Sequence, residues 1–266
     1  MRDLDDAAAN GQAGGRMRVL PCLAVTLLLA CTAAPVRAEN PDALWQIVHD
    51  RCVPDQQANG APAPCVLVDL AGGYVVLKDR DGATQFLLIP TAKVTGIEDP
   101  AILAPAAPNY FAAAWQSHDM VSQRAHHVLA RDDIGLAINS AYGRSQNQLH
   151  IHIDCLRLDV AAAVQAHAAA VGTTWAPFPV RLLGHPYLAR RVASADLSDA
   201  NPFTLLADGV PGARGDMGHW TIVAAPATID GAPGFVLLAD HLDEAIMDRA
   251  SGEELQDHAC AIKSGG

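Results

Sequence analysis

The most regular alternation of apolar and polar positions lies in residues 147–157, which read NQLHIHIDCLR. Aliphatic residues occupy every second position of this stretch, and His150 and His152 lie between them. Because successive side chains of a β-strand point to opposite faces, the pattern predicts a strand over residues 148–156 with both imidazoles on one face. Asp154 continues that face.

Other apolar runs predict the remaining elements of an α+β domain, in which helices pack on an antiparallel sheet and a C-terminal extension adds strands and short helices. Residues 173–188 read as loop, and residues 187–206 as a helix with a turn. Strands are expected at residues 66–70, 73–79, 83–90, 134–140, 220–225 and 234–239. Helices are expected at residues 41–52, 104–130 and 159–171.

The first 38 residues differ from the rest of the chain. They contain Met17-Arg18, the apolar run VLPCLAVTLLLACTAA and then Val36-Arg37-Ala38, which together are typical of an export signal. Cleavage after Ala38 would release a soluble chain, whereas retention of the segment would leave a short membrane anchor. A third possibility is lipidation, because LLAC weakly resembles a lipoprotein box. In each case we expect residues 39–266 to form the functional body, on the periplasmic side of the inner membrane.

Four cysteines, Cys52, Cys65, Cys155 and Cys260, follow the export segment. An even number of cysteines in an exported chain is suited to an oxidising compartment. Because Cys52 and Cys65 bracket a stretch rich in Pro, Gly and Asn, we predict a disulfide between them. A second disulfide is predicted between Cys155 and Cys260, and four reduced thiols remain the alternative.

The formal net charge of −11 limits the possible partners of the chain. Nucleic acid and anionic membrane surfaces both require a dense positive field for nonspecific binding, so we expect no nucleic-acid partner. A phosphate-bearing ligand would need a local group of cations.

The face formed by His150, His152 and Asp154 has three interpretations. The first is a zinc site with these residues as ligands, and the second is a set of hydrogen-bonded core residues. In the third, a neutral imidazole attacks phosphorus and forms a phosphoramidate, while amide groups bind the nonbridging oxygens. The third interpretation requires no metal, and its candidate donors are Asn139, Gln146 and Asn147.

Residues 138–155, INSAYGRSQNQLHIHIDC, resemble the signature of the histidine triad superfamily. The blocks LWQIVHDRCVP, LKDRDGATQFLLIPTAKVTGIEDPAILAPAAPNYFAAAW, LAINSAYGRSQNQLHIHI, GHPYLARRV and PFTLLAD more closely resemble bacterial CDP-diacylglycerol pyrophosphatases. This second resemblance extends from about Leu44 to Asp208. It implies a histidine-triad-like fold, a membrane-associated substrate, and hydrolysis of CDP-diacylglycerol to CMP and phosphatidate without a cofactor.

The resemblance also assigns roles to individual residues. His150 falls on the first histidine of the triad and His152 on the nucleophilic second, whereas Asp154 replaces the third. Asn139 matches an upstream asparagine, and Asn147 falls near a serine that faces the phosphate in other members. The candidate cations for the diphosphate are Arg144, Arg157, Arg190 and Arg191, with Lys78 and Lys93 behind them.

Two rival functions remain at this point. An exported zinc hydrolase would contain stoichiometric metal, and a nonenzymatic nucleotide or lipid carrier would bind CDP-diacylglycerol without releasing CMP.

Overall fold

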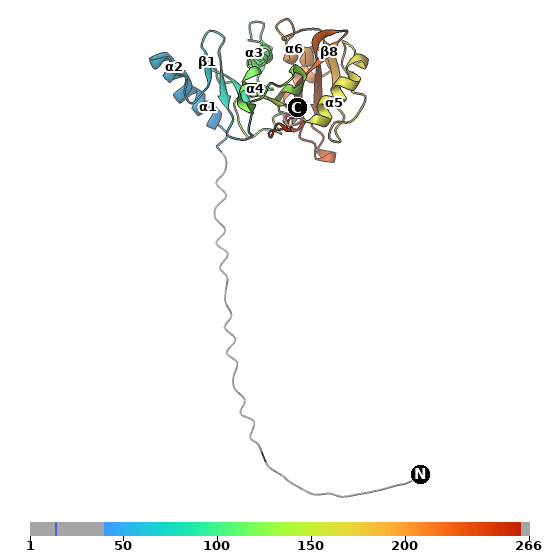
Figure 1. Cartoon of the computed structure of the whole chain (residues 1–266), viewed down its shortest axis with the longest axis horizontal. Coiled ribbons are helices and arrows are strands. Elements are labelled where there is room, and N and C mark those ends of the chain that lie inside the picture. The colour runs from blue at the N-terminus through green and yellow to red at the C-terminus, as the bar shows by residue number, and fades with distance from the viewer. Residues whose placement is uncertain (1–13, 15–39, 262–266) are drawn as a thin grey trace, which may run out of the picture. The chain divides into compact units, whose positions relative to one another are not determined.

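A computed structural model of the chain describes Gly14 and residues 40–261 (Figure 1). The export signal or anchor predicted for the first 38 residues therefore lies outside the described residues, apart from Gly14. Within the described part of the chain, no helix combines the length and the apolar character needed to cross a membrane.

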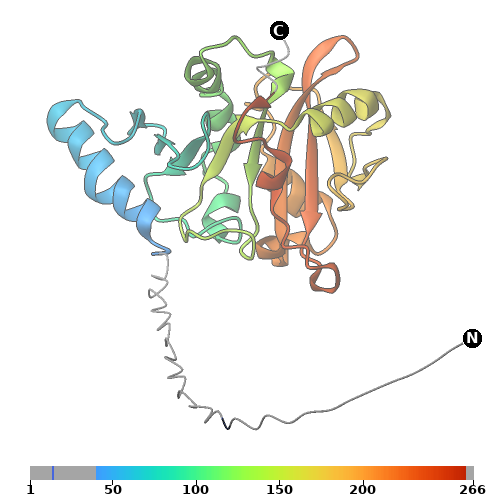
Figure 2. The same cartoon turned by 60° about the horizontal axis from the view of Figure 1, so that its bottom comes forward.

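In residues 40–261 an antiparallel sheet of nine strands forms the centre of the fold, in the order β1-β2-β3-β5-β4-β8-β9-β7-β6. The long strands β8 and β9, coloured orange, extend the sheet beyond β4 and β5 (Figure 2). This architecture confirms the α+β prediction and its C-terminal extension. The strands are β1 Leu67–Asp69, β2 Tyr74–Lys78, β3 Phe86–Pro90, β4 Ile134–Ile138, β5 Ile151–Cys155, β6 Ala176–Pro177, β7 Leu188–Val192, β8 Trp220–Ile229 and β9 Ala232–His241.

Short helices accompany the sheet, and several of the connections are single 3₁₀ turns. The helices are α1 Ala43–Ile47, a π-helical turn Val48–Cys52, α2 Val53–Asn59, α3 Tyr110–Trp115, α4 Asp119–Ala125, α5 Leu158–His167 and α6 Pro202–Gly209. The 3₁₀ turns are Pro100–Leu103, Arg131–Asp133, Ala168–Ala170, Ala213–Gly215, Met217–His219, Glu244–Ile246 and Gly252–Leu255.

Strand β5 lies between β3 and β4, so both of its edges are hydrogen-bonded. Ile151 and Ile153 pack into the largest core cluster, together with residues of α3 and α4. His152 pairs with Leu87 of β3 and Ala137 of β4, which both belong to other clusters. The predicted division of this strand into an aliphatic and a histidine-bearing face is therefore confirmed.

The long helix predicted over residues 104–130 is wrong, because the segment forms two short helices, α3 and α4, and local caps set where the first begins and the second ends. The Asn109 side chain accepts a hydrogen bond from the backbone N–H of Ala112 and so begins α3 at Tyr110. His126 takes a left-handed conformation with φ of 54° and ends α4.

Two other elements differ from their predictions. The loop expected after Cys52 begins instead with α2, because Pro54 lies in the first turn of this helix, where no intrahelical N–H is required. The helix expected within residues 187–206 is preceded by strand β7, which pairs along its whole length with β9. Because β9 is distant from β7 in the sequence, local patterns in residues 187–206 do not reveal this pairing.

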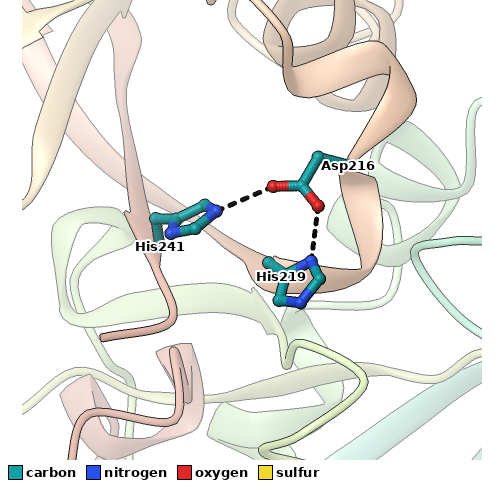
Figure 3. A group of neighbouring side chains, drawn as sticks. All are labelled: Asp216, His219 and His241. Atoms are coloured by element: carbon teal, nitrogen blue, oxygen red, sulfur yellow. Dashed lines mark hydrogen bonds and ion pairs between the residues drawn. The ribbon is translucent and has the colours of Figure 1, made fainter. Parts of the chain in front are cut away.

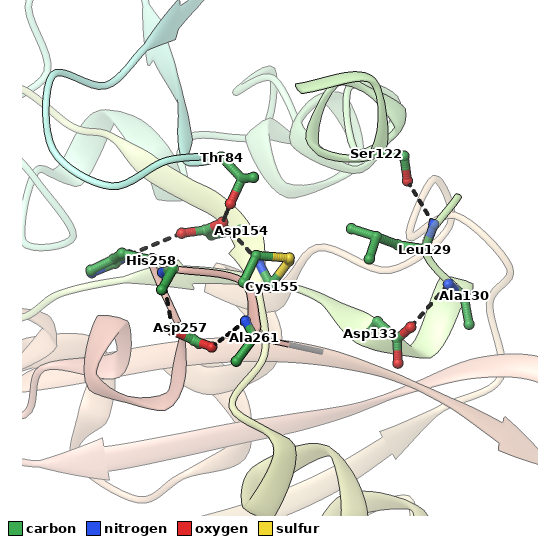
Figure 4. Close-up of a disulfide and its surroundings, with 12 residues drawn as sticks. Thr84, Ser122, Leu129, Ala130, Asp133, Asp154, Cys155, Asp257, His258 and Ala261 are labelled. Atoms are coloured by element: carbon green, nitrogen blue, oxygen red, sulfur yellow. Dashed lines mark hydrogen bonds and ion pairs between the residues drawn. A yellow bond between two sulfur atoms is a disulfide. The ribbon is translucent and has the colours of Figure 1, made fainter. Parts of the chain in front are cut away.

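The structure forms both disulfides that the sequence predicts. Cys52–Cys65 joins the N-terminal helices to the segment before β1, and Cys155–Cys260 joins β5 to the C-terminal segment. Figure 4 shows the second disulfide beside Asp154 and His258. The C-terminal segment is therefore linked covalently to the strand that carries His152.

Removing the Cys52–Cys65 disulfide by a double replacement with Ala should lower the free energy of unfolding by about 3 kcal/mol. The reason is that the bridge closes a loop with a sequence separation of 13, which restricts the unfolded chain. Urea unfolding of the variant and the parent measures the loss. Alkylation of Cys52 in the unreduced protein, detected by mass spectrometry, would show that the bridge does not form.

Candidate active site

The histidine-bearing face opens into a cavity of about 560 Å³. Its walls come from α1, from strands β2 and β3, from the loop after β4 and from the C-terminal segment. One part of the lining is apolar, namely Ala43, Leu44, Ile47, Pro64, Leu77 and Leu87. Another part is cationic, namely Arg51, Lys78, Arg80, Arg144 and Arg249. Such a cavity can accommodate an anionic group and a hydrocarbon group together.

His150 and His152 both line this cavity, with their ring centroids 4.9 Å apart. The Nδ1–H group of His150 donates a hydrogen bond of 2.7 Å to the carbonyl oxygen of Gln148. This bond assigns the proton to Nδ1 and leaves a lone pair on Nε2. Burial lowers the pKa of His150, so its ring is neutral.

His152 is only 4% exposed, and burial lowers its pKa to about 3 in spite of the nearby Glu253 carboxylate. Its Nδ1 atom lies 2.6 Å from the amide nitrogen of Gln85 and 3.3 Å from Oε1 of Glu253. Its Nε2 atom is buried and has no hydrogen-bond partner among the described residues. The site thus holds a neutral imidazole with an uncommitted nitrogen.

Glu253, which the sequence analysis missed, reaches the site from the 3₁₀ turn Gly252–Leu255. Burial by itself raises the pKa of its carboxyl group. Hydrogen bonds from His258 first, and then from Gln85 and Asn139, outweigh burial and hold the pKa well below its ordinary value. Glu253 is therefore an anion beside Nδ1 of His152.

Asp154 occupies the place of the third triad histidine, and it contacts another histidine. His258 Nδ1 lies 2.9 Å from Asp154 Oδ2 (Figure 4). His258 Nε2 lies 3.3 Å from Glu253 Oε1. Hydrogen bonds to Asp154 and then to Glu253 raise the pKa of His258 to about 10, so its ring is charged. Asp154 also accepts a 2.6 Å bond from Thr84. A polar chain thus runs from Asp154 through His258 and Glu253 to His152.

The three predicted amide donors have different positions. Asn139 lines the cavity, but its side chain donates to Glu253 Oε2 and accepts from the Glu253 backbone N–H. Gln146 also lines the cavity, and it accepts a bond from the backbone N–H of Leu44 at the start of α1. Asn147 is exposed and is not part of the lining. Two of these residues therefore hold the walls of the site together.

Of the arginines predicted to bind phosphate, only Arg144 lines the cavity. Its guanidinium group forms a paired salt bridge with Glu98, with one contact of 2.7 Å. Arg190 and Arg191 lie on β7. In the sheet, strands β4, β8 and β9 lie between β7 and β5, the strand that carries His152. At about 4.8 Å between neighbouring strands, this places them about 19 Å from β5 in the plane of the sheet.

The other proposed cations also have different positions. Arg157 pairs with Asp159 at the start of α5, and Lys93 pairs with Asp42, so neither belongs to the cavity lining. Lys78 does line the cavity.

The geometry of possible metal ligands does not favour a zinc site on the histidine strand. Within residues 40–261, two groups of three His, Cys, Asp or Glu side chains have their ligand atoms within 4.8 Å of one another. Neither group contains His150, His152 or Asp154. One group is Asp216, His219 and His241 (Figure 3). The other is His185, Asp240 and Asp248. The carboxylate of Asp154 is bound to Thr84 and His258 instead.

Comparison with known proteins identifies the relatives of the chain. A model of the CDP-diacylglycerol pyrophosphatase family matches residues 39–264. The chain belongs to this family. A CDP-diacylglycerol pyrophosphatase from Yersinia pestis is 43% identical over 249 residues, which cover 93% of this chain and 95% of that protein.

In this member of the CDP-diacylglycerol pyrophosphatase family, several residues of the site were not predicted from the sequence. They are Arg51, Gln85, Arg249, Glu253 and His258. Most of them belong to segments that are far from β5 along the chain. The sequence around a charged or amide residue does not show which distant segment its side chain contacts. The disulfide prediction offered one usable signal, because it placed the C-terminal segment against β5.

Proposed function

We propose that this protein hydrolyses CDP-diacylglycerol to CMP and phosphatidate, with His152 as the nucleophile. The observation that carries the proposal is the buried, neutral imidazole of His152, whose Nε2 atom is unpaired among the described residues and which lines a cavity with cationic and apolar walls. Membership of the CDP-diacylglycerol pyrophosphatase family supports the choice of substrate.

The two kinds of wall match the two parts of the substrate. Arg51, Lys78 and Arg249 can bind the diphosphate, and Arg144, although paired with Glu98, adds a fixed positive charge. The apolar wall includes α1, which follows the predicted export segment in the chain. We therefore place the diacylglycerol part against this wall, where burial of hydrocarbon is favourable.

In the first chemical step, Nε2 of His152 attacks the phosphorus atom next to the cytidine. An N–P bond forms, the anhydride P–O bond breaks, and phosphatidate leaves with the electron pair of that bond. Bond formation at Nε2 places a positive charge on the ring. The ionised Glu253, 3.3 Å from Nδ1, stabilises this charge, whereas Nδ1 of His150 faces only a neutral carbonyl group.

In the second step, water attacks the phosphohistidine and releases CMP, which restores the neutral imidazole. The nucleophilic tautomer of His152 carries its proton on Nδ1, where Glu253 can accept the hydrogen bond. The other tautomer accepts a hydrogen bond from Gln85 at Nδ1 and has no lone pair on Nε2. Attack therefore requires the tautomer in which Nδ1 donates to Glu253.

Incubating the purified protein with a panel of nucleoside diphosphate compounds tests the proposed reaction. CDP-diacylglycerol should release CMP and phosphatidate in equal amounts, and faster than CDP-choline or UDP-sugars release their monophosphates. Binding of CDP-diacylglycerol without release of CMP would identify the protein as a carrier.

We further propose that the body lies on the periplasmic side of the inner membrane, as the export segment and the two disulfides suggest. In spheroplasts of a Gram-negative host, added protease should therefore digest the body while a cytoplasmic marker remains intact. Extraction with carbonate separates an anchored chain from a released one. Protection of the body until the inner membrane is lysed would contradict the proposal.

A further inference from the structure

A second polar cluster lies where the turn at residues 182–185, the end of β9 and the C-terminal segment meet. Its members are His185, Asp240 and Asp248. His185 Nδ1 lies 3.2 Å from Asp248 Oδ2 and 3.8 Å from Asp240 Oδ2. Asp240 is 4% exposed and Asp248 is 2% exposed, so two carboxyl groups are buried beside one imidazole.

The three facing atoms of this cluster lie close to one another, but none of them forms a hydrogen bond within the described residues. Nδ1 of His185 and the Oδ2 atoms of Asp240 and Asp248 are buried, and in the described part of the chain they have no hydrogen-bond partner. The Oδ1 atoms accept backbone N–H groups from His241 at 2.9 Å and Ala250 at 2.8 Å. Bonds of this kind orient metal-binding carboxylates and leave the second oxygen for the ion.

Carboxyl groups outnumber basic side chains in the described part of this cluster. Glu254 adds a third carboxylate, whose Oε1 lies 2.9 Å from His185 Nδ1 and accepts a 3.0 Å bond from Tyr187. Among the described residues, the ion pairs of Asp240, Asp248 and Glu254 are all with His185. Three carboxyl groups beside one imidazole leave negative charge in the interior, which is costly unless a further cation is bound.

We propose that His185, Asp240 and Asp248 bind a divalent first-row metal ion, with zinc as the best fit and Glu254 next to the ion. Zinc binds imidazole nitrogen and carboxylate oxygen at about 2.0 to 2.2 Å, and tetrahedral ligands at that distance lie about 3.3 Å apart. The two separations from His185, 3.2 and 3.8 Å, are close to this value. Calcium prefers a shell composed entirely of oxygen, which the imidazole does not provide.

The metal would hold the C-terminal segment in place. Asp248 and Glu254 are the sequence neighbours of Arg249 and Glu253, which line the cavity. An ion bound to β9 and to this segment would therefore fix both cavity residues without touching the substrate. Its role is structural and does not depend on the proposed reaction.

The cluster at Asp216 provides a matched control. Each oxygen of Asp216 already contacts a histidine ring nitrogen, one on His219 and one on His241, and its side chain is 43% exposed (Figure 3). The hydrogen bonds within this cluster satisfy its carboxylate. It has the same residue types as the proposed site but lacks the buried oxygens that form no hydrogen bond within the described residues.

The experiment uses the full-length protein, stripped with EDTA and then titrated with zinc chloride. The stripped protein should take up equimolar zinc, measured by elemental analysis after gel filtration. Zinc at about 100 times its dissociation constant should raise the melting midpoint by about 5 °C or more. Asp248→Asn and Asp240→Asn should each weaken zinc binding at least tenfold, whereas Asp216→Asn and His152→Ala should bind zinc as the parent does.

Equal zinc binding by the parent and Asp248→Asn would overturn the proposal. Loss of zinc binding in His152→Ala would also overturn it, because the metal would then be bound at His152. If the aspartate variants do not fold, zinc uptake and the melting midpoint of the parent protein still test the proposal. An unchanged melting midpoint with EDTA and with zinc, without equimolar uptake, would then refute the site. None of these measurements uses substrate, so their outcome is separate from the test of the proposed reaction.

Discussion

Replacing His152 with Ala should reduce the turnover of CDP-diacylglycerol by more than about 10⁴-fold, because the covalent route through Nε2 disappears. His150→Ala should cost less, about 100-fold, since this neutral ring orients the site beside His152 without bonding to phosphorus. The measurement is the release of CMP from a cytidine-labelled substrate under saturating conditions. Circular dichroism and melting curves establish that each variant is folded.

The covalent intermediate gives a second measurement of the same prediction. Rapid quenching of the parent protein with labelled substrate should leave acid-labile, base-stable label on the chain, as expected of a phosphohistidine. His152→Ala should show no label, whereas His150→Ala should still be labelled slowly. Near-normal turnover in His152→Ala, or label retained in that variant, would assign nucleophilic attack to another group.

Glu253→Gln should reduce turnover by about 100-fold or more, because the neutral amide no longer stabilises the positive charge on His152 during attack. Glu253 acts through His152, so it is a positioning residue in this scheme. Glu244→Gln, an exposed change on the same C-terminal segment, is the matched control and should keep the parent rate. A loss confined to KM would indicate a binding role for Glu253 instead.

A pH titration tests the contact between Glu253 and His258. In the parent, Asp154 and Glu253 raise the pKa of His258 to about 10 from an ordinary value of 6.5. The stabilisation from charged His258 is therefore complete below pH 6.5 and is lost as the pH rises through about 10. In Glu253→Gln this loss should begin at lower pH, and NMR titration of the His258 ring should show it. An unchanged His258 pKa would contradict the contact.

The sequence by itself determined those parts of the protein that depend on local chain properties. The alternation around His150 and His152 requires a two-faced strand, because side chains of a strand alternate between faces whatever the rest of the fold does. Apolar runs likewise predicted the strands that form β2 and β3, and α5 followed from an alanine-rich helical segment. Family membership also followed from the sequence, since the quoted blocks extend over most of the body.

Only the tertiary structure decided how the histidine face is completed. Glu253 and His258 lie about 100 residues beyond β5 in the chain, and Gln85 lies 67 residues before His152. The Cys155–Cys260 bridge and the packing of the C-terminal segment bring Glu253 and His258 to the site, and the pairing of β3 with β5 brings Gln85. Arg190 and Arg191 show the converse, because strand order places two promising cations away from the cavity. Contacts between distant segments depend on the burial of the whole chain, and local sequence patterns do not record it.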